Sequence, residues 1–169
     1  FLALPHGHSH VLADQIERYQ GVTIDLSADF RLNDVTIFDQ IYQQQHQAEL
    51  LNRSFVLGIP ELKRDALAHT DYVACPGCYS TSVMLALYPL VELSEKLGTV
   101  IVDAKSGITG AGRSAKLDYL YSECSNTFSA YTSGSHRHTA EIEQEIGASI
   151  VMTNYLVPMN RGIISTCYL

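Results

Sequence analysis

A cysteine near the middle of the chain has the surroundings of a reactive thiol. The string A-C-P-G-C-Y-S-T at residues 74–81 runs from an apolar strand into Pro76 and Gly77 and places Cys78 at the start of a helix. Proline fixes one backbone angle and glycine permits a tight turn. Because a helix N-terminus stabilises negative charge, we expect this position to favour the thiolate form. Cys78 is therefore a candidate nucleophile, with a buried structural cysteine as the alternative.

Cys75 and Cys78 also form a C-x-x-C pair, a pattern found in redox-active dithiols and in zinc sites. A thioredoxin-like site would need the pair after the first strand of a small βαβ domain, whereas here it lies in mid-chain. A zinc site would recruit His136 and His138, but H-x-H is not the usual spacing of zinc fingers. We therefore expect no metal at these positions.

A second candidate group is the string G-S-H-R-H-T at residues 134–139. Its two histidines flank Arg137 just ahead of a helix that we expect to begin near Thr139, a good N-cap residue. An imidazole can take a proton from a thiol and return one to an oxyanion. His136 and His138 are therefore candidate acid–base residues. The histidines expected to be structural or exposed are His10, His46 and His69.

A third candidate is the glycine-rich string D-A-K-S-G-I-T-G-A-G-R at residues 103–113. A glycine-rich loop after a strand exposes backbone N–H groups that can bind a phosphate or a nicotinamide amide. The string has neither G-K-[ST] nor G-x-G-x-x-G, so a plain turn is an equal alternative. The string D-L-S-A-D-F-R at residues 25–31 is similarly suggestive, and its alternative is a capping or turn network.

Short apolar strands alternate with helical patterns, which indicates α/β architecture. The expected strands are Phe1–Leu4, Val22–Leu26, Tyr72–Ala74, Thr99–Ala104, Ile150–Leu156 and Ile163–Tyr168. The expected helices are Ser9–Arg18, part of Asp34–Leu51, the segment after Cys78 with a restart at Pro89, and the segment from Thr139. The first strand, the first helix and the second strand could form a βαβ crossover.

Composition favours small-molecule chemistry. The chain has 169 residues, 46% of them hydrophobic, and a net charge of −7. This charge argues against nucleic acid or an anionic membrane as partner, and no apolar run is long enough for a membrane span. Four cysteines in a chain without a signal-peptide pattern favour a reduced, cytoplasmic protein. Both ends read as strands, so we expect the chain to be part of something larger.

Taken together, these strings resemble the N-acetyl-γ-glutamyl-phosphate reductase family. The matching motifs occur in order along nearly the whole chain, which is more specific than any one of them. They are F-L-A-L-P-H-G at residues 1–7, D-L-S-A-D-F-R, G-I-P-E-L at 58–62, C-P-G-C-Y-S-T, S-G-I-T-G-A-G-R, H-R-H-T-A-E-I and R-G-I at 161–163.

The resemblance implies the chemistry of an acyl-phosphate reductase. Cys78 would form a thioester with an acyl phosphate, and NADPH would reduce it to a semialdehyde. His136 would be the acid–base residue, with His138 second. The residues expected to contact the cofactor are Pro5, His6, Ser106, Gly107 and Gly110. The candidate contacts for phosphate or carboxylate are Arg113, Lys105 and Arg137.

The resemblance also implies an architecture. Residues 1–77 would be the C-terminal half of a Rossmann-type NADP-binding domain. Residues 78–169 would be part of a glyceraldehyde-phosphate-dehydrogenase-like α+β catalytic and dimerisation domain. The N-terminal nucleotide loop and a C-terminal segment are missing, so activity of this piece alone is not implied. The full-length protein is expected to be a homo-oligomer, a dimer or a tetramer.

The sequence departs from the family pattern at Ser80, Ser82 and Ala140, none of which removes a catalytic group, and at the additional thiol of Cys75. Two alternatives stay open. One is a related reductase of aspartyl or N-acetyl-aminoadipyl phosphate. The other is a non-catalytic metal or redox module, built on both cysteines of the C-x-x-C pair and both histidines of residues 134–139.

Overall fold

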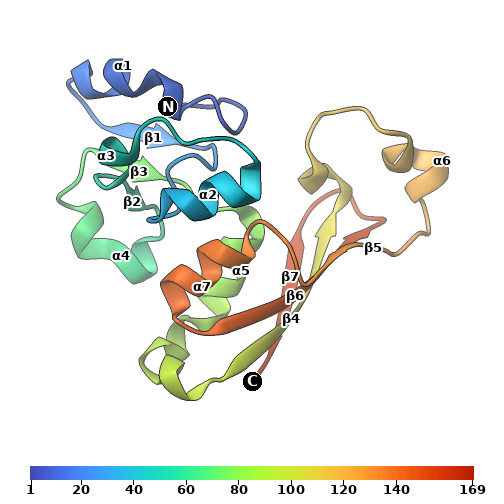
Figure 1. The fold of residues 1–169 in the computed structure, drawn as a ribbon. Coiled ribbons are helices and arrows are strands. Elements are labelled where there is room, and N and C mark those ends of the chain that lie inside the picture. The colour runs from blue at the N-terminus through green and yellow to red at the C-terminus, as the bar shows by residue number, and fades with distance from the viewer. The chain divides into compact units, whose positions relative to one another are not determined.

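Figure 1 shows a computed structural model of the chain, which describes residues 1–92 and 97–169 in full and residues 93–96 by their backbone alone. The chain divides into two compact units, residues 1–77 and 78–169, and each is described by itself. Each unit contains a β-sheet and several helices, which confirms the expected α/β class. Across the described residues, no helix combines the length and the apolar character that a membrane span needs.

The first unit is built on a parallel sheet with the strand order β1-β3-β2. The strands are β1 (Thr23–Asp25), β2 (Val56–Leu57) and β3 (Tyr72–Ala74). Parallel strands require crossover connections, and helical segments supply them. The segments between the strands are α2 (Val35–Tyr42), α3 (Glu49–Asn52) and α4 (Pro60–Leu67), and η1 (His10–Leu12) and α1 (Ala13–Arg18) precede β1.

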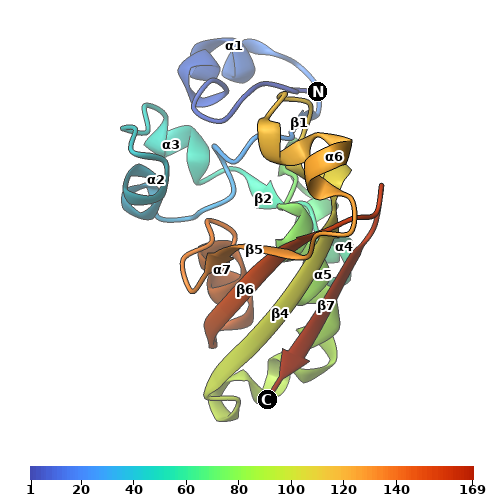
Figure 2. The same cartoon turned by 90° about the vertical axis from the view of Figure 1, so that its right-hand side faces the viewer.

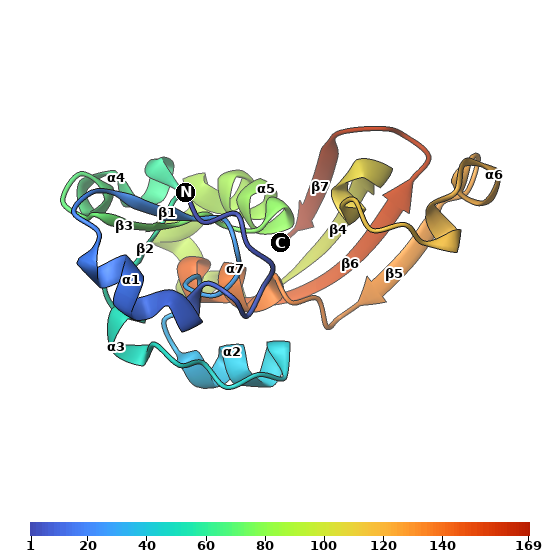
Figure 3. The ribbon, with the colours of Figure 1, turned by 90° about the horizontal axis from the view of Figure 1, so that it is seen from above.

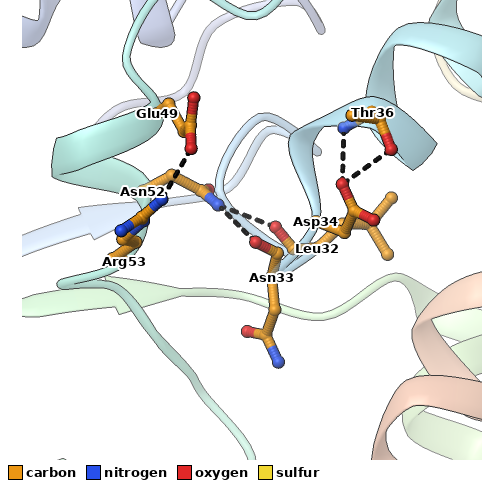
Figure 4. A network of polar contacts seen from close by, with 7 residues as sticks. All are labelled: Leu32, Asn33, Asp34, Thr36, Glu49, Asn52 and Arg53. Carbon is orange, nitrogen blue, oxygen red and sulfur yellow. Dashed lines mark hydrogen bonds and ion pairs between the residues drawn. The ribbon is translucent and has the colours of Figure 1, made fainter.

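Local hydrogen bonds set the ends of α2 and attach α3 to it. The Asp34 carboxylate accepts from the backbone N–H of Thr36 at 2.8 Å, which caps α2 (Figure 4). Gln43 ends the helix with a φ of +53°, in the left-handed region. The Asn52 amide donates to the carbonyl oxygen of Leu32 at 2.8 Å, so α3 is tied to the loop before α2.

The second unit has a mixed sheet with the strand order β5-β6-β4-β7, of which Figure 2 shows β6, β4 and β7 side by side. Strands β4 and β6 are parallel, whereas β7 and β5 run antiparallel to their neighbours. The strands are β4 (Thr99–Gly107), β5 (Ser129–Ser133), β6 (Ser149–Val157) and β7 (Ile163–Tyr168). The helical segments are α5 (Cys78–Leu87), η2 (Tyr88–Lys96), η3 (Ile108–Ala111), η4 (Leu117–Tyr119), α6 (Tyr121–Cys124) and α7 (Thr139–Ile146).

Helices α5 and α7 pack against one face of this sheet and against each other (Figure 3). Along β4 the burial alternates, because successive strand residues point to opposite faces. Val100, Val102, Ala104 and Ser106 are buried on the helix side. Ile101 points to the other face, where it is 55% exposed. The core of this unit therefore lies between the sheet and the two helices.

Most expected elements are present, with three corrections. Strands β3 and β7 have the predicted bounds. The expected strand Phe1–Leu4 is wrong, because only Leu2 forms a bridge to Asp25 and Phe1 is 90% exposed. Thr139 is the first residue of α7 and not its N-cap, which is His138. The prediction also missed the short segments β2, β5, α4 and α6.

Candidate active site

Cys78 is the first residue of α5, and it is the exposed one of the four cysteines. Cys75, Cys124 and Cys167 are half-buried, and all four are free thiols. Burial raises the pKa of Cys75 and of Cys167, so these two thiols hold their protons more tightly. The structure therefore leaves Cys78 as the accessible thiol.

Cys75 continues the sheet of the first unit beyond β3. Its backbone N–H donates to the carbonyl oxygen of Asp25 at 2.8 Å, which extends the pairing with β1 by one hydrogen bond. Its thiol is half-buried just past the strand. This hydrogen bond gives Cys75 a backbone role at the end of the sheet, independent of its thiol.

His136 lies in the loop between β5 and α7, and its ring orientation is fixed from both sides. The Nδ1 atom accepts from the backbone N–H of His138 at 3.1 Å, and Nε2 lies 3.5 Å from the hydroxyl of Tyr131. Burial, with the neighbouring Arg137 guanidinium as a second cause, lowers the pKa of His136 to about 4. The imidazole is therefore neutral near pH 7, and its single proton belongs on Nε2.

Tyr79 links the start of α5 to both histidines. Its ring centroid lies 5.4 Å from that of His136 and 6.2 Å from that of His138. The two imidazoles are themselves 4.6 Å apart and edge to face. The Tyr79 hydroxyl donates to the carbonyl oxygen of Tyr155 in β6 at 3.1 Å, which anchors the ring to the sheet. The residue that follows Cys78 is thus packed against both predicted acid–base residues.

A cavity of about 380 Å³ opens at this cluster within the second unit. Its wall contains Ser106, Gly110, His136 and Arg137, four of the residues predicted from the sequence. The wall also contains residues that were not predicted, among them Tyr79, Lys116 and Tyr131. Tyr131 sits at a register shift of β5, a β-bulge, and such bulges turn a side chain away from the regular alternation. Neighbouring glycines or charges in the sequence do not signal such a bulge.

Two predicted anion contacts lie elsewhere in the second unit. Lys105 belongs to the face of β4 opposite Ser106, where its ammonium forms an ion pair with the Asp103 carboxylate. Arg113 is exposed, and neither residue is part of the cavity wall. Strand alternation explains the Lys105 result, because adjacent residues of one strand cannot face the same cavity.

Models of known protein families match both units. Residues 78–169 match the semialdehyde dehydrogenase dimerisation domain, and residues 1–70 match the semialdehyde dehydrogenase NAD-binding domain. The chain belongs to the semialdehyde dehydrogenase family.

The chain spans about half the length of the curated relatives that it matches. One is an N-acetyl-gamma-glutamyl-phosphate reductase of Desulforamulus reducens, 46% identical over 99% of this chain and 51% of the relative. Another, from Clostridium novyi, carries the same name and is 44% identical with the same coverage.

Solved structures of this family share the fold. Aspartate semialdehyde dehydrogenase II from Vibrio cholerae superposes with a TM-score of 0.60 at 15% identity, covering 86% of this chain and 47% of that one. The Candida albicans aspartate semialdehyde dehydrogenase with NADP gives 0.57 at 13% identity, covering 98% and 49%. At these identities the likeness concerns the fold alone.

The glycine-rich loop was predicted to bind the cofactor, and close packing explains two of its glycines, Gly107 and Gly110. A Cβ on Gly107 would lie 2.9 Å from the backbone nitrogen of Arg161 and from the carbonyl oxygen of Met159. A Cβ on Gly110 would collide with the hydroxyl of Ser106. Ser106 and Gly110 line the cavity, so they fit a ligand there, whereas Gly107 is buried outside its wall.

In the first unit, the string at residues 25–31 is a turn network, as its alternative had it. The buried Asp29 carboxylate accepts from the backbone N–H groups of Gly7 at 2.7 Å, Ser9 at 2.8 Å and His10 at 3.1 Å. His6 is half-buried, and its Nδ1 accepts from the backbone N–H of Ala28 at 2.9 Å. Pro5 is exposed. The network holds the loop that carries Pro5 and His6, the two cofactor contacts predicted in the first unit.

The remaining histidines have the surroundings expected of them. His10 and His46 are buried and stacked at 4.7 Å, and His69 is exposed.

Among the side chains that the structure describes, no group of three His, Cys, Asp or Glu residues could hold a metal ion.

Proposed function

We propose that this chain is part of an N-acetyl-γ-glutamyl-phosphate reductase. The reaction would reduce N-acetyl-L-glutamyl 5-phosphate to N-acetyl-L-glutamate 5-semialdehyde with NADPH, in arginine biosynthesis. The observation that carries the proposal is the exposed Cys78 in the same helical turn as Tyr79, whose ring packs against both imidazoles. The identity of 41–46% with relatives of that name, over 99% of this chain, supports the substrate.

In this proposal Cys78 is the nucleophile. Its sulfur attacks the acyl carbon, the bond from that carbon to the phosphate oxygen breaks, and phosphate leaves with the bonding electrons. When bound, the reduced nicotinamide supplies a hydride. The oxyanion on the sulfur-bound carbon then collapses, the carbon–sulfur bond breaks, and the semialdehyde leaves a thiolate on Cys78. The cysteine is regenerated in each cycle.

The hydrogen bonds of His136 indicate which proton transfer this imidazole can make and which one it cannot. With its proton on Nε2, neutral His136 can donate to an oxyanion. Taking the thiol proton needs an unprotonated ring nitrogen, and Nδ1 of His136 is occupied by the backbone N–H of His138. We therefore propose that His138 shares the acid–base role, with His136 as the donor to the oxyanion.

The two units would have separate tasks. We propose that residues 1–77 are the C-terminal half of the NADP-binding domain, with Pro5 and His6 as cofactor contacts, and that residues 78–169 are part of the catalytic and dimerisation domain. The positions of Ser106 and Gly110 in the cavity wall support contacts to the nicotinamide end. Gly107 would act by letting the backbone of Met159 and Arg161 pass close to its own.

We further propose a homo-oligomer, a dimer or a tetramer, of the full-length protein. The sheet face opposite α5 and α7 carries a group of exposed apolar side chains, which marks an interaction surface. They are Ile101, Val151, Ile164 and Tyr168, between 45% and 64% exposed. A cytoplasmic location belongs to the same proposal, because a reducing compartment keeps four cysteines as free thiols.

The test is turnover by the full-length protein. N-acetylglutamate semialdehyde, inorganic phosphate and NADP should give NADPH, and NAD should serve less well. The same assay with aspartate semialdehyde and with N-acetylaminoadipate semialdehyde is the control. Faster turnover of either control substrate would replace the proposed substrate by that one. A protein without turnover that binds zinc would favour the metal module instead.

A further inference from the structure

Two tyrosine hydroxyls connect His136 to the sheet of the second unit. Tyr79 is buried, and its hydroxyl donates to the carbonyl oxygen of Tyr155 at 3.1 Å. A second hydrogen bond joins the hydroxyl of Tyr79 to that of Tyr131. The Tyr131 oxygen in turn lies 3.5 Å from Nε2 of His136. The tyrosine pair, Tyr79 and Tyr131, therefore leads from the imidazole to a backbone carbonyl of β6.

The order of donors and acceptors in the tyrosine pair follows from the carbonyl at its end. A carbonyl oxygen only accepts, so the single hydroxyl proton of Tyr79 is directed at Tyr155. The hydrogen bond between the two hydroxyls then requires the proton of Tyr131. With that proton engaged, the Tyr131 oxygen acts toward His136 as an acceptor. The imidazole must therefore carry its proton on Nε2.

The surroundings of the Tyr79 hydroxyl support this order. The carboxamide of Asn154 lies beside it and is fully buried. The Oδ1 atom of Asn154 accepts from the Thr132 hydroxyl at 3.1 Å, so the amide nitrogen, which only donates, is the group left for Tyr79. This amide offers no acceptor that would draw the Tyr79 proton away from the Tyr155 carbonyl.

The opposite side of the imidazole requires the same tautomer. Nδ1 of His136 accepts from the backbone N–H of His138 at 3.1 Å, so in the neutral ring this nitrogen has no proton. Both phenols also keep their protons near neutral pH, because burial raises the pKa of Tyr79 and of Tyr131. Two separate contacts of the ring thus place its proton on Nε2. At 3.5 Å the contact with Tyr131 is long, so it orients this N–H without holding it tightly.

We propose that Tyr79, acting through Tyr131, is a positioning residue that keeps the proton of His136 on Nε2. Tyr79 does so by accepting the hydroxyl proton of Tyr131 in a hydrogen bond. Without that acceptor, the Tyr131 hydroxyl can turn and donate to Nε2, which favours the tautomer with the proton on Nδ1. The value of this for catalysis rests on the proposed function, in which His136 donates from Nε2 to an oxyanion. The order of the hydroxyls does not rest on it.

Nitrogen NMR of the full-length protein, labelled on its histidine rings and free of substrate, measures where the proton lies. His136→Asn identifies the signals of this ring, and we expect the Nε2–H form in the wild type. Tyr79→Phe keeps the ring that packs against both imidazoles and removes only the hydroxyl. It should raise the ratio of the Nδ1–H to the Nε2–H form about fivefold, the effect of one neutral hydrogen bond. Tyr88→Phe, at an exposed tyrosine of η2, should leave the ratio unchanged.

A double variant separates this role from packing. In Tyr131→Phe no hydroxyl remains that could donate to Nε2, while the contact of Nδ1 with the backbone of His138 is kept. The ratio of the two forms should therefore stay at the wild-type value. Adding Tyr79→Phe to this variant should change the ratio no further. A merely structural role of Tyr79 would shift the ratio equally with and without the Tyr131 hydroxyl.

Three results would overturn the proposal. They are a proton on Nδ1 of His136 in the wild type, which needs no variant to observe, an unchanged ratio in Tyr79→Phe, and an equal shift in the double variant. In turnover, Tyr79→Phe should lower kcat in proportion to the loss of the Nε2–H form, with KM unchanged. The NMR readout does not need turnover, so the two proposals fail separately. A protein that shows the shifted ratio but reduces no acyl phosphate would refute the proposed function alone.

Discussion

Both units contain histidines whose Nδ1 atom accepts a backbone N–H, but the surroundings of these rings differ. In His10, His46 and His136 the Nδ1 atom accepts a backbone N–H, at 3.1, 3.2 and 3.1 Å. The difference is what the second nitrogen meets. Nε2 of His46 lies 2.9 Å from the carbonyl oxygen of Asp29 in a buried network. Nε2 of His136 lies 3.5 Å from a hydroxyl at the wall of a cavity. A weakly engaged nitrogen at a cavity is available to a ligand.

Neighbouring charges affect the pKa values of these three histidines in different directions. Burial lowers the pKa of all three. In the first unit Asp29 and Asp39 oppose this effect, whereas Arg137 adds to it at His136. The first unit thus encloses His10 and His46 with carboxylates and backbone groups, whereas the second places the half-buried His136 beside a cation at the wall of a cavity. We therefore expect substitutions in the first unit to change mainly the free energy of unfolding, and substitutions in the second unit to change mainly the activity.

The largest stability effect is expected at Asp29. Asp29→Ala leaves three buried backbone N–H groups without their acceptor, which should lower the free energy of unfolding by about 3 kcal/mol or more. Asp34→Ala is the matched control, because this carboxylate also accepts a backbone N–H but is exposed. The loss of this exposed carboxylate should lower the free energy of unfolding clearly less than the loss of Asp29. Denaturant unfolding measures both, and equal losses would contradict the distinction between the two networks.

At His136 the effect should be on catalysis. In the full-length protein, His136→Asn should lower kcat by about a hundredfold with a modest change in KM, because a proton donor is lost while binding groups remain. Its unfolding free energy should stay near that of the wild type. His138→Asn is the comparison variant. A larger loss of kcat in that variant would reverse the order of the two residues.

A smaller effect is expected from pH on the first unit. The folded-state pKa of His46 lies below its unfolded value of 6.5, so the unfolded chain takes up the proton more readily. This contribution to stability is present above pH 6.5 and is lost as the pH falls toward the folded-state pKa. Asp25, whose pKa burial raises, acts in the opposite direction at lower pH. The unfolding free energy of wild type should therefore fall below pH 6.5 more steeply than that of His46→Gln, and parallel curves would contradict this.

Strands with strong local signals could be predicted from the sequence, and short polar ones could not. Tyr72–Ala74 and Ile163–Tyr168 are apolar or β-branched runs with clear boundaries. Ser129–Ser133 has mostly exposed, small or polar side chains. Its pairing with β6 is a long-range contact that no local sequence pattern indicates. Phe1–Leu4 has the composition of a strand but forms only one bridge to the sheet. Composition alone does not show whether a segment pairs with its neighbours.

Four of the predicted site residues line one cavity, but the arrangement of that cavity could not be predicted from the sequence. The proximity of Tyr79 to both imidazoles depends on α5 and α7 packing on the same sheet face, which no spacing encodes. Lys105 was chosen for its charge, and only the strand register shows that it faces away from the cavity. Lys116 lies in a segment without a motif, and its contact with Tyr119 appears only in the fold.

The central claim, that Cys78 is the nucleophile, can be tested without the cofactor. The full-length protein is incubated with N-acetylglutamyl phosphate in the absence of NADPH, quenched in acid, digested and mapped by mass spectrometry. We predict an N-acetylglutamyl group on the peptide that contains Cys78, its absence in Cys78→Ser, and its persistence in Cys75→Ala. An acyl group on Cys75, Cys124 or Cys167, or release of phosphate with no acylated cysteine, would contradict the account.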